Sequence, residues 1–488
     1  MIRVDAGSQI LSPAERYGLD VLVDLSRLLV AEHAECELVR VEVVDRQTAG
    51  SAAADLSHHA ALVRGDGVVR ITTASLRAVA EIAGGAIEQR CRTTDRHGRV
   101  PSTENPLVAA GQSRRPVVSV LARELRRAVF AVAGRRPVRS LAPWPDGHRW
   151  AALVSHDLDV VDWWLVFPVL RMIELASKGS WSLMSRVGRS ARRNFRRDPV
   201  TRGVHSILQL EAHHGIRASW FVICSQPSVR SFLSGDSTYN PHGQAARRIL
   251  SALTQAGHEI GLHGSFATAE DAKLMSDQRR TLARLTGTPV VGARQHFLRM
   301  KPGRTQSHMT VSGFEYDATW GFADRNGFRL GVADLVPAWH EAEAATLPLE
   351  IVPLMWMDRA LSKYAGVEEP GDWIEDAREL IEECKSVEGC WVGLWHPNTV
   401  EALGFPGGEP AFVSLLQALA DDRPFFASAH KLVQWRRFRR SVRAARVTAD
   451  GRLALTTPAG HRTVIALEDE AGDTTRVQLQ ASRSSDTA

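Results

Sequence analysis

The sequence contains few cysteines and no apolar run long enough for a membrane span. Its 488 residues include five cysteines, which are scattered and form no CxxC pair. Such a set indicates free thiols in a reducing compartment rather than a disulfide framework. The best candidate for a span, 163–170 (WWLVFPVL), is too short to cross a bilayer and contains a proline. The first residues are polar and acidic where a signal peptide needs an apolar core, so we expect a cytoplasmic protein without a transmembrane segment.

The excess of positive over negative charge is also small, because the formal net charge is only +5. Two basic runs stand out, at 186–198 (RVGRSARRNFRRD) and 430–440 (HKLVQWRRFRR). No aromatic-interleaved nucleic-acid motif accompanies either run, so no nucleic-acid partner is expected. Each run is typical of a solvated helix face, and the alternative is peripheral contact with an anionic surface. The sequence does not indicate an oligomeric state.

A repeated order of helix, glycine and short apolar strand is present between about 145 and 440. Each glycine lies where a left-handed backbone would end a helix. With the strands WAALVS, LPLEIVPLMWM and PFFAS, this order gives seven or eight strands. It predicts an α/β fold with a parallel sheet that curls into a distorted (β/α)7-8 barrel. The five glycines are Gly215, Gly257, Gly287, Gly313 and Gly389.

The segments on either side of this barrel predict three parts in all. Residues 1–145 mix helical and strand patterns and are expected to form an N-terminal α/β domain of unknown role. Residues 146–440 form the barrel. Residues 441–488 alternate apolar and polar positions between turn signals, which predicts a small β-rich appendage that ends in a disordered tail.

Five predicted strands each end in an aspartate or a histidine. Because catalytic groups gather at the carboxyl ends of parallel strands, we expect these side chains to share one site. Aspartate and histidine are the ligands of a catalytic zinc ion, which keeps one position for water. A second carboxylate can take the proton of that water, and an imidazole can protonate a leaving group. The residues are Asp157 and Asp159, His263, Gln295 and His296, Asp358, and His396.

The motifs VSHDLD, AGHEIGLHGS, GARQH and GLWHP resemble those of the polysaccharide deacetylases, the carbohydrate esterases of NodB-homology type. They occur in that family's order and cover roughly residues 148–430. The resemblance implies a deacetylase barrel in which a metal-dependent water removes acetyl groups from N-acetylated sugars. It implies a divalent metal, zinc first, with cobalt or another borderline transition metal as an alternative.

The resemblance also implies a role for each matching residue. Asp157 corresponds to the general base, Arg294 to the arginine that orients it, and His396 to the general acid. Asp159 and His263 correspond to metal ligands. The family's further histidine, four residues after the first, is replaced by Ala267. His296 is the expected substitute, with His156 or no third protein ligand as alternatives.

Three further residues are expected near the substrate. Trp320 and Trp395 lie close to strand ends, where aromatic faces stack on sugar rings, although a core role is the alternative. Asp358 is expected near the substrate, and it has the alternative roles of orienting His396 or pairing with Arg294.

The expected function is therefore metal-dependent hydrolysis of the C–N amide bond of an N-acetylated carbohydrate. Two alternatives remain at this stage. The first is a non-catalytic carbohydrate-binding or scaffold protein that keeps the fold, and the second is an amidohydrolase acting on a small cyclic metabolite.

Overall fold

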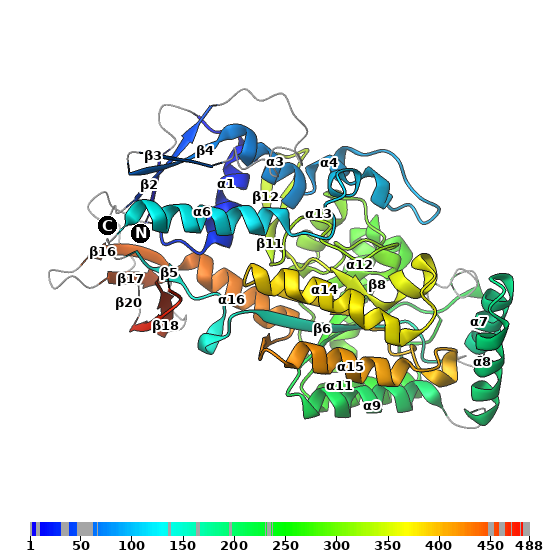
Figure 1. Cartoon of the computed structure of the whole chain (residues 1–488). Coiled ribbons are helices and arrows are strands. Elements are labelled where there is room, and N and C mark those ends of the chain that lie inside the picture. The colour runs from blue at the N-terminus through cyan, green and yellow to red at the C-terminus, as the bar shows by residue number, and fades with distance from the viewer. Residues whose placement is uncertain are drawn as a thin grey trace.

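The computed structural model is described for most of the chain (Figure 1). The described residues are 2–5, 10–30, 39–45, 62–65, 67–134, 138–162, 166–194, 198–229, 231, 236, 238–447, 453–457, 464–469, 471–478 and 480–481.

A curled sheet of ten strands forms the centre of the molecule. Eight of its strands are parallel neighbours, and β11 (Val336–His340) adds an antiparallel edge. The tenth strand, β15 (Phe425–Phe426), pairs with the first residues of β6. The eight, in spatial order, are β12 (Ala345–Ile351), β10 (Tyr316–Asp317), β9 (Gly292–Gln295), β8 (Glu259–Gly264), β7 (Ser219–Ile223), β6 (Ala151–Leu158), β14 (Cys390–Leu394) and β13 (Trp356–Met357).

One continuous run of chain joins the two ends of this parallel array. β12 and β13 lie at opposite ends of the spatial order but are separated by only residues 352–355. Val352 donates its backbone N–H to Asp317 at 2.8 Å, and Met355 donates to Val392 at 3.1 Å. The sheet therefore closes on itself through this segment, and the predicted distorted (β/α) barrel is confirmed.

Helices precede the barrel strands and end as the glycine pattern predicts, with one exception. Gly215, Gly257, Gly287 and Gly313 have φ angles between 68° and 78°, which glycine adopts without a Cβ clash. The prediction for Gly389 is wrong, because the left-handed residue there is Glu388, with φ 56°. Gly389 serves another purpose, since a Cβ atom would lie 2.2 Å from the carbonyl oxygen of Ala333. The helices are α9 (Pro199–His213), α11 (Gln244–Gln255), α12 (Ala272–Thr286), α13 (Arg304–Val311), α14 (Trp373–Ser386) and α15 (Gly408–Ala420).

The N-terminal part packs its own sheet and helices against the barrel (Figure 1). Its four strands are ordered β1 (Ile2–Asp5), β2 (Val39–Val44), β4 (Val68–Thr72) and β3 (Leu62–Gly65), and α1 (Pro13–Ser26), α3 (Thr73–Ala83) and α6 (Val117–Ala133) lie beside them. Tyr17 donates its hydroxyl to the Pro337 carbonyl of β11 at 2.9 Å. One cluster of buried hydrophobic side chains includes residues of both parts, so they share a core.

The C-terminal residues form two small sheets. β16 (Arg443–Val447), β17 (Leu453–Thr457) and β20 (Gln480–Ala481) make one, and β18 (Val464–Glu468) with β19 (Thr474–Gln478) and β5 (Ser140–Leu141) makes the other. The tail predicted to be disordered, 482–488, lies outside the described residues.

A helical hairpin of α7 (Val166–Ser177) and α8 (Trp181–Asn194) projects from one side of the barrel (Figure 1). It has a small core of its own, formed by Leu175, Leu183 and Val187. Four large apolar side chains on it are at least half exposed: Val169, Leu170, Ile173 and Trp181. Within the part of the chain that the structure describes, no helix has the length and apolar character of a membrane span.

Candidate active site with a metal-binding cluster

The polar side chains predicted from the strand ends meet at one end of the barrel. Asp157 belongs to β6, and Asp159 follows that strand directly. Successive residues of an extended strand point to opposite faces, so the side chains of residues 157 and 159 share one face. His263 comes from β8 and His296 from the turn after β9. Strands that are neighbours in the sheet thus bring these groups together.

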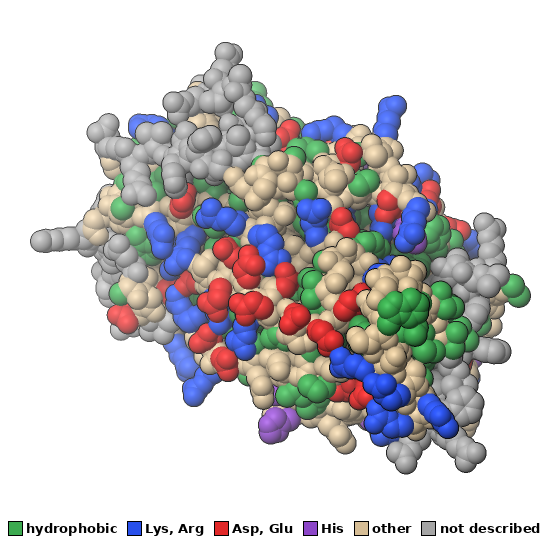
Figure 2. Space-filling model, turned by 45° about the vertical axis from the view of Figure 1, so that its right-hand side comes forward, with side chains coloured by type: hydrophobic (Ala, Val, Ile, Leu, Met, Phe, Trp, Pro, Cys, Tyr) green, Lys and Arg blue, Asp and Glu red, His purple; other side chains and the backbone are tan. Residues whose placement is uncertain are grey.

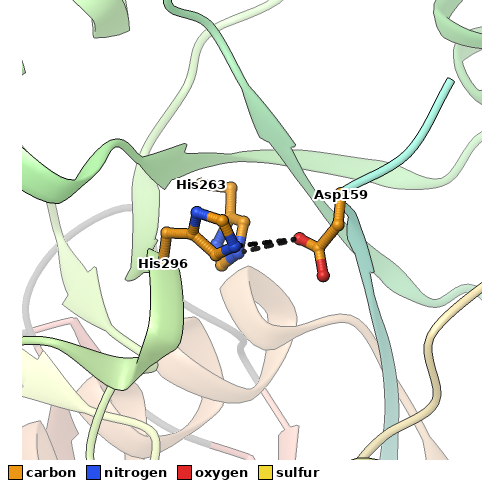
Figure 3. Close-up of side chains that lie close together, drawn as sticks. All are labelled: Asp159, His263 and His296. Atoms are coloured by element: carbon orange, nitrogen blue, oxygen red, sulfur yellow. Dashed lines mark ion pairs between the residues drawn. The ribbon is translucent and has the colours of Figure 1, made fainter. Parts of the chain in front are cut away.

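Asp159, His263 and His296 form a cluster that suits a metal ion (Figure 3). Their ligand atoms all lie within 4.8 Å of one another. Asp159 Oδ1 is 3.3 Å from His263 Nε2 and 3.7 Å from His296 Nε2. Both imidazoles point toward the carboxylate in Figure 3.

The hydrogen bonds of His263 leave its other ring nitrogen to a cation. Its Nδ1 lies 3.0 Å from the backbone carbonyl oxygen of Arg294, which can only accept, so Nδ1 carries the proton. Nε2 then presents a lone pair, which is the arrangement of a zinc-bound histidine. Burial would lower the pKa of His263, but Asp157 and Asp159 raise it. Protons and a metal therefore compete for Nε2.

The carboxylate of Asp159 also fits a cation. Its Oδ1 atom is buried and has no hydrogen-bond partner among the described residues. Burial would raise the pKa of Asp159, but the neighbouring histidines hold it well below its ordinary value. Two imidazole nitrogens and one ionised oxygen are the ligand set of catalytic zinc sites, so the residues present fit a divalent cation.

Asp157 stands beside the cluster and is held by Arg294. Arg294 Nη1 donates to Asp157 Oδ1 at 2.8 Å, while its Nη2 donates to Ser155 Oγ at 3.0 Å and its Nε to the Ala318 carbonyl at 3.0 Å. The guanidinium is fully buried. The free oxygen of Asp157, Oδ2, lies 3.6 Å from His263 Nε2 and faces the cluster.

His396 approaches the cluster from another direction and is held by Asp358. Its Nδ1 lies 2.6 Å from Asp358 Oδ1, and its Nε2 lies 3.6 Å from Asp159 Oδ2. Asp358 also accepts from the His396 backbone N–H at 3.0 Å and from Thr399 Oγ1 at 2.7 Å. Burial alone would lower the pKa of His396, but Asp358 and Asp159 outweigh it and raise the pKa.

A cavity of about 480 Å³ opens in front of these groups. Its volume lies in the range of small-molecule pockets, ~300–1,000 Å³. Asp157, Asp159, His263, His296 and His396 are among its lining residues. Aromatic side chains from several elements form apolar parts of its wall: Phe167, Phe297, Tyr364 and Phe405.

The N-terminal part supplies one side of this cavity, through His97 and Arg99. Arg99 donates to the carbonyl of Phe297 at 3.0 Å, and the His97 ring stacks on Phe297 at 5.1 Å. Phe297 and Leu298 both have left-handed backbones, with φ 59° and 53°. Such angles cost a bulky residue roughly 1–3 kcal/mol and occur mainly at functional sites. The strained turn places Phe297 against His296, with ring centroids 3.9 Å apart.

Some predicted residues are not brought to the cavity. Trp320 and Trp395 are each only 2% exposed and pack in the core, so neither presents a ring face to a ligand there. Asp358 is fully buried behind His396, which agrees with its alternative role of orienting that histidine. His156, the alternative ligand, uses both ring nitrogens elsewhere, on the Trp395 carbonyl and Glu211.

Several residues of the site were not predicted. Asp236 lies 3.4 Å from His296 Nδ1, and Ser155 supports Arg294. Arg359 could have been found, because it directly follows Asp358 at a strand end. Arg99 and Phe297 had no signal, since their parts in the site depend on a contact between distant segments and on a left-handed backbone without glycine or asparagine.

No protein-family model matches the chain, and neither does any curated protein. Solved structures similar to it include a candidate polysaccharide deacetylase from Mycobacterium smegmatis, with 19% identity, 63% of this chain and 96% of that chain covered, and a TM-score of 0.42. An allantoinase has 15% identity, with 62% of this chain and 95% of that chain covered, and a TM-score of 0.38. A carbohydrate esterase family 4 pseudoenzyme from Bacillus anthracis has 12% identity, coverages of 62% and 69%, and a TM-score of 0.28.

Several of the similar structures are members of the family that the motifs resemble.

Proposed function

We propose that the protein is a metal-dependent hydrolase that removes acetyl groups from an N-acetylated carbohydrate. One observation carries the proposal. Two groups that can transfer protons, Asp157 and His396, contact different members of the Asp159–His263–His296 cluster, and each lies 3.6 Å from a side-chain atom of that member. Each is also held by a buried partner of opposite charge, Arg294 for the base and Asp358 for the acid.

The chain supplies the proton transfers of amide hydrolysis. Asp157, which Arg294 holds in position, accepts a proton from the attacking water. His396, whose pKa is raised by Asp358 and Asp159, donates a proton to the departing nitrogen. The C–N bond then breaks to give acetate and the free amine.

Asp159, His263 and His296 are the proposed ligands, and zinc is the proposed metal. When bound, such a cation supplies Lewis acidity to the amide carbonyl and acidity to water. Cobalt is the alternative because it accepts the same ligand types.

Acetate release from N-acetylglucosamine and its oligomers, with added zinc or cobalt, tests the proposal. We expect Asp157→Asn and His396→Ala each to lower kcat by about 10²–10⁴-fold. Matched variants at exposed positions, Asp421→Asn and His242→Ala, control for effects unrelated to the site. Full activity in both site variants would refute the assignment of roles.

Metal content separates this proposal from a binding-only protein. We expect about one equivalent of zinc per chain, and much weaker binding in His263→Ala. His296→Ala should weaken zinc binding as well, whereas an exposed histidine such as His242 should not matter. Absence of stoichiometric metal would favour the non-catalytic alternative.

A reducing, cytoplasmic location is also part of the proposal. Four cysteines, Cys91, Cys224, Cys384 and Cys390, are free thiols. Burial raises the pKa of Cys224 to about 12, so this thiol stays protonated and unreactive. Proteins with several unpaired cysteines are typical of reducing compartments.

Contact with an anionic surface is proposed for the α7–α8 hairpin. The exposed arginines of α8 are Arg186, Arg189, Arg192 and Arg193, and the helix contains no acidic residue. The exposed apolar side chains of the same hairpin lie on α7 and at Trp181. Figure 2 shows hydrophobic side chains beside a group of Lys and Arg on the right of the molecule. Apolar and basic side chains together are typical of helices that bind at the surface of anionic membranes.

A further inference from the structure

One part of the cavity wall is basic, and another part carries the Asp159–His263–His296 cluster. Four basic side chains line the cavity. Two of them are neutralised by carboxylates, because Arg99 pairs with Asp95 at 2.6 Å and Arg171 pairs with Glu174 at 2.9 Å. The other two are Arg359 and Lys363, which follow β13 in one short segment.

Arg359 and Lys363 form no ion pair within the part of the chain that the structure describes. No carboxylate of a described residue lies within 4.0 Å of either side chain, and neither donates a hydrogen bond to a described residue. Their contacts are with aromatic faces: the Arg359 guanidinium is 4.7 Å from the Phe405 ring centroid, and Lys363 Nζ is 5.6 Å from that of Tyr364. Burial lowers the pKa of Arg359 and outweighs the longer-range attraction of Asp358, Glu174 and Asp159, whereas Lys363 is exposed.

The acidic lining residues have nearer partners than these two cations. Asp157 is bound by Arg294, Asp159 belongs to the metal cluster, and Glu174 is held by Arg171 and by Lys178 at 3.1 Å. A partly desolvated guanidinium without an anion costs free energy, and a ligand that brings an anion recovers it. The wall is therefore complementary to a negative group on the substrate.

We infer that the substrate is an N-acylated sugar that carries an anionic substituent, a phosphoryl or a carboxyl group, which Arg359 and Lys363 bind while the acyl group lies at the metal cluster. The inference rests on the proposed function, because it places the sugar between the two walls. Phe405 and Tyr364, which contact the two cations, provide apolar surface for the intervening ring. Arginine binds phosphate and carboxylate oxygens in pairs, and lysine adds a point charge.

Calorimetric titration of the full chain tests this inference without any turnover. The probes are N-acetylglucosamine, N-acetylglucosamine 1-phosphate and N-acetylmuramic acid, which differ in having no anion, a phosphoryl group or a carboxyl group. The titrations use metal-free protein, so that an anionic sugar cannot gain affinity by binding to zinc. We expect at least one anionic sugar to bind about tenfold or more tightly than the neutral one.

The double variant Arg359→Gln/Lys363→Gln should bring the ratio of anionic to neutral affinity close to one. Its matched control, Arg280→Gln/Lys273→Gln on the exposed side of α12, should keep the wild-type ratio. Which of the two anionic sugars binds more tightly identifies the substituent. A preference that survives in the double variant, or equal affinity for all three sugars in the wild type, would overturn the inference.

Acetate release by the zinc-loaded wild type separates the two proposals. Deacetylation without any anion preference would leave the hydrolase assignment standing and remove the inference. An anion preference that depends on Arg359 and Lys363, without deacetylation of any probe, would support the anion site and remove the assigned activity.

Discussion

At the scale of single residues, the proposed function makes the pair of His396 and Asp358 the groups that set the working pH range. Asp358 is fully buried, and its carboxylate is 2.6 Å from His396 Nδ1. A general acid must be protonated, so activity falls as pH rises through its pKa. Because Asp358 raises the pKa of His396, the proposed role of His396 predicts activity that extends toward higher pH.

Asp358→Asn should therefore lower the pKa of His396 and move the alkaline limb of the kcat profile to lower pH. The measurement is kcat between about pH 5 and 10 for the zinc-loaded enzyme. Thr399→Val is the matched comparison, since it removes a hydrogen bond to Asp358 but leaves the charge. It should shift the limb much less. Superimposable limbs in Asp358→Asn and wild type would show that His396 is not the acid.

The ordered motifs predicted which residues converge, but not which aromatic residues line the cavity. Asp159, His263 and His296 could be placed because each ends a strand of one parallel sheet, and such ends meet. Trp320 and Trp395 also lie near strand ends, yet both are buried in the core. Sequence position does not determine which side of a strand end faces solvent, and so the aromatic residues of the cavity were missed.

At the scale of secondary-structure elements, the barrel strands were predictable and the exact helix ends were less so. Each predicted apolar run contains an observed strand, because buried parallel strands are continuous in apolar residues. The exception at Gly389 arises because glycine serves two purposes. Glycine permits a left-handed backbone, but it also permits close approach, and Gly389 is needed for its contact with Ala333.

The α7–α8 hairpin should bind vesicles that contain anionic lipid. Arg189 and Arg192 are exposed and have no ion-pair partner among the residues described. Each arginine near an anionic membrane contributes about 1 kcal/mol, so Arg189→Gln/Arg192→Gln should weaken binding by roughly 30-fold. Co-sedimentation with phosphatidylcholine vesicles, with and without phosphatidylglycerol, measures this.

A double variant on α11, Arg247→Gln/Arg248→Gln, is the matched control for this hairpin experiment, because both arginines are exposed on another helix. It should bind like the wild type. Trp181→Ser should also weaken binding, since it removes exposed apolar surface. Equal binding to neutral and anionic vesicles would contradict the expectation.

At the scale of the whole molecule, a buried glutamate ties the C-terminal strands to the rest of the chain. Glu468 of β18 is 1% exposed and pairs with Arg27 after α1 at 3.0 Å, Arg126 of α6 at 3.4 Å and Arg149 before β6 at 2.5 Å. One carboxylate thus joins three regions that are distant in the sequence.

Glu468→Gln should lower the free energy of unfolding by about 1–3 kcal/mol, because it removes one of two carboxylates and leaves Glu388 alone to pair with the same arginines. Urea unfolding followed by tryptophan fluorescence measures this change. Glu382→Gln removes an exposed partner of Lys385 on α14 and should cost less than about 0.5 kcal/mol. Equal unfolding midpoints for the two variants would show that the Glu468 pairs contribute nothing to stability.

The contribution of the N-terminal part to the cavity was the feature that the sequence predicted least well. Residues 97–99 carry no motif, and only folding places them against the turn after His296. A contact between two regions that lie this far apart leaves no local periodicity to detect.

Because His97 and Arg99 form one side of the cavity, the barrel alone does not carry the whole recognition surface. If the barrel were exchanged between related proteins, in the laboratory or by recombination of genes, the pocket would lose one wall unless the preceding segment were exchanged with it. New ligand preferences can correspondingly arise from changes in that segment, while Asp159, His263 and His296 stay as they are.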